Sequence, residues 1–441
     1  MTQRRLWLEG VLWIVAYIAL TLGPLAVVFI GDAPPARGFW TEFSSALGFA
    51  GLSMLGLQFA ITARFGRIAA PYGLDIALQF HRHITLVAAA VLLAHVLLLF
   101  VTRPETLALL NVIDAPWRAR AGVASMVVLM ALIGASIWRE RLGISYELWR
   151  QTHALAAVLA VGLGFVHVVG VGHYLSIGWK QVFWLTITAA AFALLGYIRL
   201  VKPFMLQRRP WRVAGVVPQR GDAWSLVLEP VGHTGFRFQP GQFCWLTLGT
   251  SPFAIREHPF SISSSARQED HVELTIKALG DFTSRISDVQ PGTTAYLDGP
   301  YGAFTPNRKD SPAYVMIAGG IGITPMMSIL RTFADDADPR HILLIYAAGG
   351  WDDITFREEI DELRQRLDLE IHYVLRDPPE GWEGLTGKVT NELLDDLTDT
   401  DVQHVSFFVC GPPALMEAVQ SSLEDLGVPL WNIRLERFNL V

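Results

Sequence analysis

The stretch QFHRHITLVAAAVLLAHVLLLF, at positions 79–100, is long and apolar enough to span a membrane as a helix, yet it contains three histidines. Ionisable side chains are costly inside a bilayer and usually have a function where they occur. His81, His83 and His95 therefore decide what kind of membrane domain this chain builds.

Further apolar stretches of similar length flank this one and make the first half of the chain a membrane domain. Hydrophobic residues make up 51% of the sequence and charged residues 17%, and the apolar runs gather before position 206. The first run is too long for a cleavable signal peptide and lacks a small-residue cleavage site. The predicted spans are 7–30, 40–63, 80–101, 121–138, 149–171 and 178–200.

Basic residues predict how this domain is oriented. Nine lie on the side of the N-terminus: Arg4, Arg5, Arg64, Arg67, Arg139, Arg141, Lys202, Arg208 and Arg209. Five lie on the opposite side: Arg37, Arg103, Arg118, Arg120 and Lys180. This excess favours a multi-pass protein of the cell membrane with a cytoplasmic N-terminus and a cytoplasmic C-terminal half.

Two of the spans carry histidines with the same spacing. His81 and His95 are 14 residues apart, and so are His153 and His167. Fourteen helical residues return to within about 40° of the same face and rise about 21 Å. The two spans run in the same direction, so His81 pairs with His153 and His95 with His167. Two imidazoles facing each other between helices can fill both axial positions of a haem.

Other interpretations of these histidines stay open. A buried histidine can simply be hydrogen-bonded to its neighbours. His83 lies about 120° away from the face of His95 and is expected at the membrane interface. His173, beyond the end of its span, is expected at the surface, with a contact to the outer haem as the alternative.

The C-terminal half has the composition of a soluble protein. From Arg212 to about Asp298, short segments rich in β-forming residues alternate with Gly, Pro and Asp, which predicts a small antiparallel barrel. From Ala313, apolar strands alternate with helical stretches, which predicts a parallel α/β sheet. The net charge of −6 gives no indication of a nucleic-acid partner, and two cysteines provide neither a disulfide framework nor a metal site.

Two turns of the predicted parallel sheet could bind a dinucleotide. AGGIGITP, at 318–325, places glycines between a strand and a helix, where backbone amides can approach a pyrophosphate. CGPP, at 410–413, follows a second strand. A tight strand-to-helix turn is the alternative for the first motif, and a small buried hydrophobic residue is the alternative for Cys410.

In combination these motifs are more specific. The order HPFSISSS, KALGDFTSRI, GPYG, AGGIGITPMMSIL and VCGPPALM resembles flavoproteins of the ferredoxin–NADP reductase type. Together with the paired histidines, the chain resembles the NADPH oxidase/ferric reductase family, in its prokaryotic form. The resemblance implies a multidomain membrane protein: a six-helix transmembrane haem bundle (1–206), an antiparallel β-barrel FAD domain (207–308) and an α/β parallel-sheet NAD(P)H domain (309–441).

The resemblance also implies roles for individual residues. Two b-type haems would be held by His81, His95, His153 and His167. FAD would be contacted by His258, Pro259, Phe260, Ser261, Lys277, Gly280, Thr283 and Phe438. NAD(P)H would be contacted by Gly319, Gly320, Gly322, Thr324, Pro325, Cys410, Gly411 and Pro412. Cys410 and Phe438 would act at the site of hydride transfer, with Phe438 covering the flavin until nicotinamide displaces it. An ordinary core phenylalanine is the alternative for Phe438.

Two positions depart from the family pattern. Relatives that choose NADPH often have a basic residue after the strand that matches LLIYAAGG, but positions 347–350 have none, which leaves only Arg357 and Arg376 as distant candidates. The histidine that helps to form the oxygen site of animal oxidases is replaced by Leu99. The nucleotide preference and the acceptor therefore stay open.

The expected function is electron transfer from cytoplasmic NAD(P)H through FAD and two haems to an extracytoplasmic small molecule, either oxygen, giving superoxide, or a ferric chelate. One alternative is a haem reductase that serves a quinone or a periplasmic partner protein. Another is a histidine-lined transporter or channel with a regulatory nucleotide domain. The lipid bilayer is the expected environment, and the sequence names no protein partner.

Overall fold

The computed structural model describes residues 3–31, 34–64, 73–176, 178–249, 251–253, 256–306, 311–397 and 402–438. The chain divides into two compact units. The helical unit consists of Trp7–Ile68 and Ile76–Val201, and most of the C-terminal unit is Lys202–Val441. Each unit contains its own hydrophobic cores.

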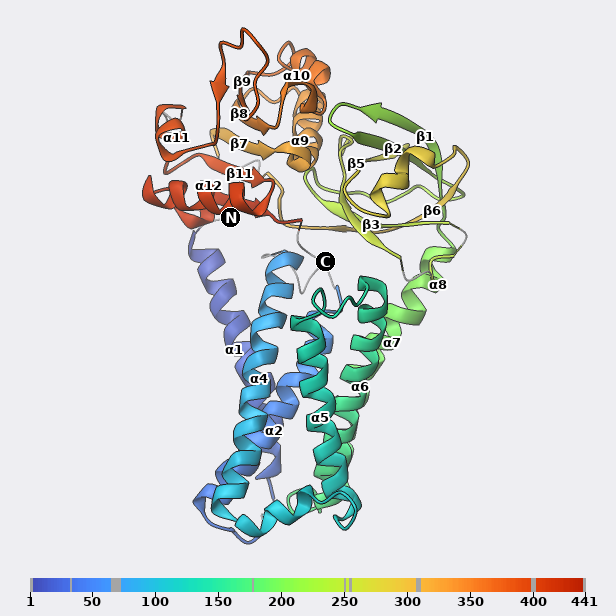
Figure 1. The fold of residues 1–441 in the computed structure, drawn as a ribbon, viewed down its shortest axis with the longest axis vertical. Helices are drawn as coiled ribbons and strands as arrows, with labels where there is room; N and C mark the ends of the chain where they lie inside the picture. Colours follow the sequence, from blue (N-terminus) through green and yellow to red (C-terminus); the bar gives the residue numbers. More distant parts are fainter. Residues whose placement is uncertain are drawn as a thin grey trace. The chain divides into compact units, whose positions relative to one another are not determined.

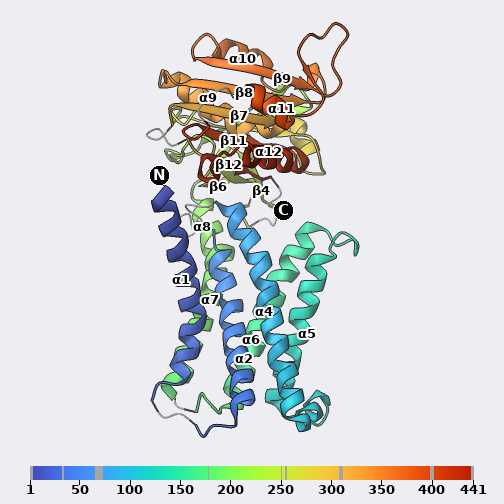
Figure 2. The same ribbon diagram turned by 90° about the vertical axis from the view of Figure 1, so that its left-hand side faces the viewer.

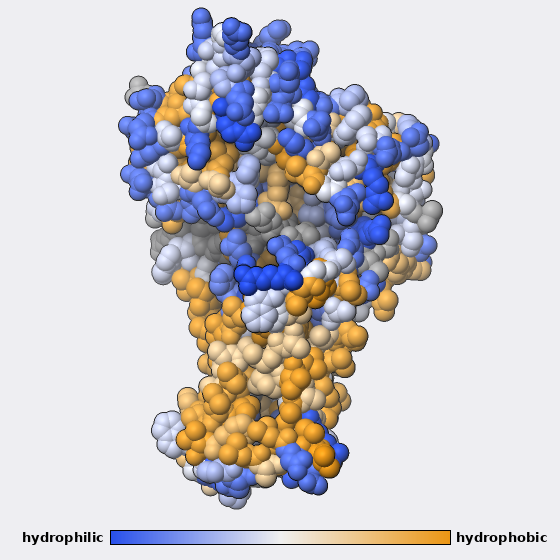
Figure 3. Space-filling model, in the orientation of Figure 1, coloured by the Kyte–Doolittle hydropathy of each residue, from blue (hydrophilic) through white to orange (hydrophobic). Residues whose placement is uncertain are grey.

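The helical unit contains the six predicted membrane helices, which run side by side (Figures 1 and 2). Most of its outward-facing surface is hydrophobic, as expected for a multi-pass membrane protein (Figure 3). The helices are α1 (Gln3–Val28), α2 (Phe39–Ile61), α4 (Leu74–Thr102), α5 (Trp117–Ile137), α6 (Tyr146–Val171) and α7 (Gly178–Gly196), with the 3-10 helix η1 (Pro104–Leu110) and the π-helix η2 (Tyr197–Val201). Helix α8 (Lys202–Gln207) follows η2 and begins the C-terminal unit.

Helix α2 is the central helix of this unit. In the most apolar 18 residues of α2, 56% of the residues are buried, whereas the corresponding share is at most 17% in the other five helices. Its polar side chains therefore have to find partners within the bundle, because lipid offers none. Two of them, Ser44 and Gln58, contact histidines of α4.

The first part of the C-terminal unit is an antiparallel sheet with the strand order β4-β3-β6-β1-β2-β5. It confirms the predicted barrel-like domain and encloses an apolar core that includes Leu226, Leu246 and Leu274. Its strands are β1 (Trp211–Gln219), β2 (Ala223–Pro230), β3 (Phe243–Leu248), β4 (His258–Ser261), β5 (Val272–Lys277) and β6 (Thr294–Tyr301), with the 3-10 helix η3 (Thr283–Asp288) between β5 and β6.

The second part is a parallel sheet with the order β10-β9-β8-β7-β11-β12. Helices α9 and α10 pack on one face and α11 and α12 on the other (Figure 1). The strands are β7 (Ala313–Gly319), β8 (His341–Ala348), β9 (Leu369–Leu375), β10 (Leu385–Thr386), β11 (Ser406–Cys410) and β12 (Ile433–Glu436); the helices are α9 (Ile323–Asp335), α10 (Arg357–Leu363), α11 (Asn391–Leu397) and α12 (Pro413–Asp425).

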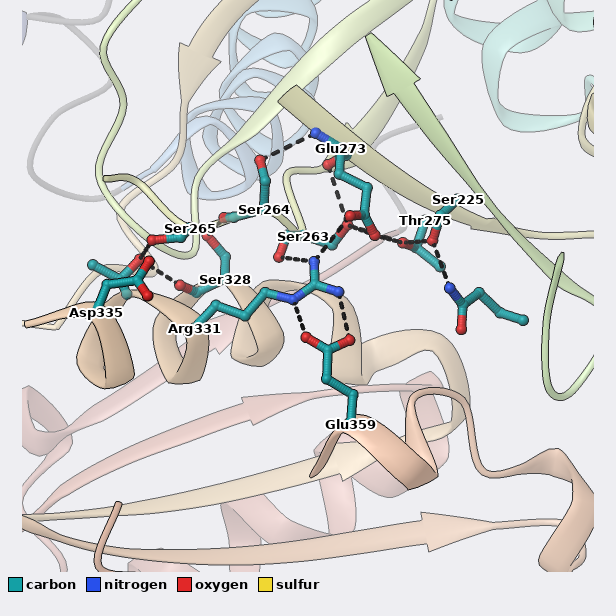
Figure 4. A network of polar contacts seen from close by, with 12 residues as sticks. Ser225, Ser263, Ser264, Ser265, Glu273, Thr275, Ser328, Arg331, Asp335 and Glu359 are labelled. Atoms are coloured by element: carbon teal, nitrogen blue, oxygen red, sulfur yellow. Dashed lines mark hydrogen bonds and ion pairs between the residues drawn. The ribbon is translucent and has the colours of Figure 1, made fainter. Parts of the chain in front are cut away.

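An arginine whose side chain is 15% exposed joins the two parts of the C-terminal unit (Figure 4). Arg331 of α9 bonds both carboxylate oxygens of Glu359, at 2.6 and 2.7 Å. It also lies 3.2 Å from Glu273 of β5 and donates to the carbonyl of Ser263 at 2.8 Å. Burial alone would lower the pKa of Arg331, but the bonds to Glu359 and Glu273 outweigh it and raise the pKa. This contact fixes the segment after β4 against the helix that follows the glycine-rich turn.

Replacing Arg331 with methionine should loosen this junction. Glu273 and Glu359 would then lose the cation that they share. Because Glu359 is 34% exposed, the cost should lie below the value of about 3–5 kcal/mol that is typical of a fully buried ion pair. Hydrogen exchange of the full chain, followed by mass spectrometry, should show faster exchange in α9 and in residues 262–266.

Arg267 provides the matched control. It makes a similar two-bond contact with Asp336, at 2.7 and 2.9 Å, but its side chain is 50% exposed. Exposed ion pairs contribute about 0–1 kcal/mol, so Arg267→Met should leave exchange nearly unchanged. Equal effects of the two substitutions would show that burial of Arg331 is not what matters.

Candidate functional site

The first candidate site lies between α4 and α6. His81 and His153, each near the start of its helix, have ring centres 6.3 Å apart and ring planes inclined at 63°. We call these residues the inner pair. His95 and His167, farther along the same helices, form the outer pair, and they are close enough to interact electrostatically. The structure thus brings the histidines together in the combination that the spacing predicts.

All four histidines direct Nδ1 toward the protein. In the inner pair, His81 Nδ1 lies 2.9 Å from Gln58 Oε1, and His153 Nδ1 lies 3.2 Å from Ser136 Oγ. In the outer pair, main-chain carbonyls lie 2.8 Å from Nδ1: that of Ser44 for His95 and that of Arg118 for His167. Ser44 Oγ lies 3.0 Å from His95 Nδ1 as well, but its proton is donated to the carbonyl of His95, at 2.8 Å. A carbonyl oxygen only accepts, so Nδ1 carries the proton and Nε2 keeps its lone pair in His81, His95 and His167.

Glycines make room for the outer pair. A Cβ atom at Gly48 of α2 would lie 3.2 Å from His95 Nδ1. A Cβ atom at Gly122 of α5 would lie 2.7 Å from His167 Nδ1, closer than real Cβ contacts. Larger residues at these positions would displace the imidazoles.

These features fit a haem with two histidine ligands. Imidazole nitrogen binds a metal ion at about 2 Å and lies about 1 Å from the ring centre, so two imidazoles on opposite sides of one ion have centres about 6 Å apart. The inner pair matches this separation. The described residues contain no cluster of three or more His, Cys, Asp or Glu that could hold a bare metal ion. A haem needs fewer protein ligands because the porphyrin supplies the equatorial nitrogens.

The other two histidines singled out in the sequence lie apart from these pairs. His83 is exposed and its Nδ1 bonds the carbonyl of Gln79 in its own helix, at 2.8 Å. His173 follows α6, stacks edge-on against Tyr174 and is partly buried, so it is not a freely exposed surface residue.

The sequence reasoning missed the hydrogen-bond acceptors of the four histidines. Ser44 and Gln58 are 14 residues apart on α2, the same spacing as the two histidines of α4. This repeat could have identified them. Ser136 gives no such signal, because it becomes a partner of His153 only through the packing of α5 against α6.

The second candidate site is formed by two turns of the parallel sheet. Strands β7 and β11 are neighbours, and the turns after them contact each other through main-chain atoms. A Cβ atom at Gly322 would lie 2.2 Å from the carbonyl oxygen of Cys410, and one at Gly319 would lie 2.8 Å from Pro412. Gly320 has φ +52°, in the left-handed region. Glycine is therefore required here, and both predicted nucleotide segments lie together.

Other predicted residues of these turns have structural roles. Thr324 is buried, and its hydroxyl donates to the carbonyl of Ile321 at 2.9 Å. Pro325 is buried in the first turn of α9, and Gly411 lies directly against Gly319. Helix α9 has no side-chain cap at its N-terminus, which leaves backbone amides for an anionic group.

Cys410 is fully buried at the end of β11, opposite Glu436 in the neighbouring strand β12. Burial, and then the charge of Glu436, raise the pKa of Cys410, so the thiol stays neutral. Glu436 Oε2 also lies 3.6 Å from the position of a Cβ at Gly302, in the GPYG turn of the barrel. Glu436 was not predicted, although it lies only two residues before Phe438.

The predicted flavin segment forms the edge strand β4. Among the residues that the structure describes, none lies within hydrogen-bonding distance of the buried hydroxyl of Ser261. His258 stacks on Phe282 at 4.0 Å, and Phe260 stacks on the same ring at 6.2 Å. A buried hydroxyl without a partner suits a polar ligand and stacked aromatic rings suit a flat one, so this segment offers both kinds of contact that a flavin would use. Phe282 is an addition to the predicted set.

The remaining predicted flavin residues differ in their surroundings. Pro259 and Lys277 are partly buried, and Gly280 is exposed. The hydroxyl of Thr283 accepts from the amides of Leu279 and Gly280, both at 2.9 Å, so it organises this turn. Phe438 is 41% exposed, which excludes an ordinary core position.

The structure also revises the account of basic residues near the nucleotide segment. Arg376 is distant in sequence, yet its Nη2 lies 3.4 Å from the position of a Cβ at Gly349. It is 75% exposed and pairs with Asp377. Arg357 instead lies over the ring of Trp351 at 4.4 Å and donates to its carbonyl. The turn after β8 therefore has a cation beside it, supplied by the residue that follows β9.

Comparison with known proteins identifies the domains of this chain. Three family models match: a ferric reductase-like transmembrane component at residues 47–164, an FAD-binding domain at 226–305 and an oxidoreductase NAD-binding domain at 316–421. Relatives include NADH-cytochrome b5 reductase 1 of Neosartorya fischeri, 34% identical over 37% of this chain and 56% of the relative. The reductase component of propane 2-monooxygenase from Rhodococcus jostii is 30% identical over 52% of this chain and 62% of the relative.

The matches thus span little more than half the length of these relatives. A flavohemoglobin structure from Malassezia yamatoensis, with bound FAD and heme, resembles the fold with a TM-score of 0.50 at 17% identity, over 90% of this chain and 96% of that one. The three family matches follow one another along the chain in the order that the motifs predict. The chain is therefore a fusion of a ferric reductase-like transmembrane domain with the FAD-binding and NAD-binding domains of a ferredoxin–NADP reductase-type oxidoreductase.

Proposed function

We propose that this chain transfers electrons from NAD(P)H, through FAD and two b-type haems, to a small-molecule acceptor on the opposite side of the membrane, either oxygen or a ferric chelate. The observation that carries the proposal is the set of four intramembrane histidines. They form two pairs, and each points Nδ1 at a protein partner, in a chain that also contains an FAD- and NAD-binding module.

When bound, FAD would accept a hydride and release electrons singly, and the haems would carry one electron at a time. The protein supplies the positions. The glycines at 319, 322 and 411 let the two predicted nucleotide turns lie directly against each other, so that both could contact one dinucleotide, and the neutral Cys410 thiol would add no charge beside a flat ring. The hydroxyl of Ser261 has no hydrogen-bond partner among the described residues and could bond to the flavin.

The inner pair would hold one haem and the outer pair the other, and with two imidazole ligands each haem would supply one-electron transfer rather than a binding site for the acceptor. The pairs are 14 residues apart on each helix, about 21 Å along its axis, which divides the roughly 30 Å thickness of the hydrocarbon core. The excess of basic residues on the side of the N-terminus favours placing the C-terminal unit in the cytoplasm.

A reduced-minus-oxidised absorption spectrum of the purified protein tests the proposal. Haem bands that appear on addition of NAD(P)H, with two haems and one FAD per chain, would support it. A chain that binds nucleotide but has no haem bands would favour the transporter alternative. Turnover only with a quinone or an isolated periplasmic protein would favour the partner-dependent reductase.

Replacing His95 with leucine should remove the outer haem alone. The inner haem, held by His81 and His153, should keep its place and become reduced by NAD(P)H, while turnover of an external acceptor falls to near background. Haem-to-flavin ratio and acceptor turnover measure this. His83→Leu is the control, because His83 is exposed and bonds its own helix, and it should retain both haems.

Gly122→Ala should also reduce the content of outer haem. The new methyl group would lie 2.7 Å from His167 Nδ1, so the imidazole has to move. Gly134→Ala on the same helix is the matched control, since its methyl group would have a normal contact of 3.5 Å with Trp138. The pyridine haemochrome assay measures the haem content of both variants. Equal values would contradict the role of Gly122.

The fragment 206–441 should reduce an artificial dye with NAD(P)H, because both dinucleotide segments lie within the C-terminal unit. Gly322→Ala should abolish this activity, since a Cβ there would lie 2.2 Å from the carbonyl oxygen of Cys410. Gly215→Ala, which meets nothing within 4 Å, should leave it unchanged. A folded, FAD-containing fragment without dye reduction would refute the division of labour between the units.

A further inference from the structure

We propose that Gln58 and Ser136 are positioning residues that set the redox potential of the inner haem. Main-chain carbonyls that accept from His95 and His167 contribute in the same way to the redox potential of the outer haem. The inference rests on the proposed function, because it assumes that the inner pair holds a haem. It concerns the groups behind the ligands. The hydrogen bond that a ligating histidine makes through its other nitrogen fixes the tautomer and changes its strength as a ligand.

Gln58 is placed so that only its oxygen can face His81. The side chain is buried, and its Nε2 donates to the carbonyl of Met54 at 2.9 Å. Oε1 therefore faces His81 Nδ1, 2.9 Å away. Because this oxygen can only accept, His81 has to donate from Nδ1 and present Nε2 to the metal.

The hydroxyl of Ser136 takes part in three hydrogen bonds, one of which positions His153. Its hydroxyl donates to the carbonyl of Leu132 at 2.8 Å, so its one proton is already used. The same oxygen accepts from Trp149 Nε1 at 3.1 Å. His153 Nδ1, at 3.2 Å, can therefore only donate to it. This hydroxyl is a shared acceptor, unlike the amide oxygen of Gln58.

The outer pair is built differently. His95 and His167 both donate to main-chain carbonyls, those of Ser44 and Arg118, at 2.8 Å, and His95 has Ser44 Oγ as a second partner at 3.0 Å. A substitution does not remove a main-chain carbonyl. The potential of the inner haem is thus open to change by single side chains, and the outer haem serves as a reference within the same molecule.

The sign of the effect follows from the bond. An acceptor at Nδ1 increases electron donation from Nε2 to iron, which favours the ferric form and lowers the midpoint potential. Gln58→Leu and Ser136→Ala should therefore raise the midpoint potential of the inner haem. A tenfold change in the relative affinity for ferric over ferrous haem would give a shift of about 59 mV for one electron. Gln58→Glu, which provides a carboxylate acceptor, should shift it downward.

The test is a potentiometric titration of the full-length protein with its FAD and haems, followed by haem absorbance. Repeating it in the His95→Leu background assigns the inner haem. Thr186→Val is the control, because the hydroxyl of Thr186 bonds only a carbonyl of its own helix among the contacts described, that of Val182 at 2.8 Å; its midpoint potentials should match wild type.

Opposite shifts for Gln58→Leu and Gln58→Glu, at unchanged outer-haem potential, would support the proposal, since a merely structural role would not reverse sign. Loss of the inner haem in Gln58→Leu with a downward shift in Gln58→Glu would support it too. An unchanged inner-haem potential in the haem-containing variants of Gln58 and Ser136 would overturn it. Wild-type protein without haem would instead refute the proposed function.

Discussion

The helical unit is governed by the need to give every imidazole N–H an acceptor where no water can serve. Each histidine of the two pairs has two nitrogens, and only one can face a cofactor. The other nitrogen meets Gln58, Ser136, or the carbonyls of Ser44 and Arg118. In hydrocarbon an unsatisfied polar group costs several kcal/mol, about the scale of the whole protein's stability. The helices that supply these acceptors, α2 and α5, are therefore as necessary to the site as α4 and α6.

The C-terminal unit is subject to a different constraint, because the main chains of two of its turns lie in direct contact. Gly322 and Gly319 lie against the segment 410–412, because β7 and β11 are adjacent and parallel. Their turns necessarily meet at the same edge of the sheet. Arg331 then fixes the helix that starts at this edge to the barrel, through Glu273 and the carbonyl of Ser263. Burial gives this contact its energetic weight, as the comparison with Arg267 tests.

Local patterns predicted the six helices, both sheets and the histidine pairing. Hydrophobic periodicity, residue spacing and turn residues depend on the local conformation of the chain and can therefore be recognised in the sequence. Helix starts were less accurate. Helix α6 begins at Tyr146 and not 149, since Ser145 caps it by accepting from the amide of Leu148, and α5 begins at Trp117, directly after Pro116. The partners of Arg331, the approach of Arg376 to Gly349 and the pairing of Cys410 with Glu436 depend on tertiary packing. Single-sequence reasoning has no access to such contacts.

The helical site is assembled from two antiparallel pairs of helices, each of which is half of a binding site. Helix α2 supplies acceptors to both histidines of α4, and α5 supplies them to both histidines of α6. Each haem would be held by one histidine from each half, His81 with His153 and His95 with His167. Metal–ligand bonds contribute free energy to folding wherever they join separate elements. Two haems between α4 and α6 would therefore cross-link the halves at two depths, and the same bonds that place the cofactors would stabilise the bundle.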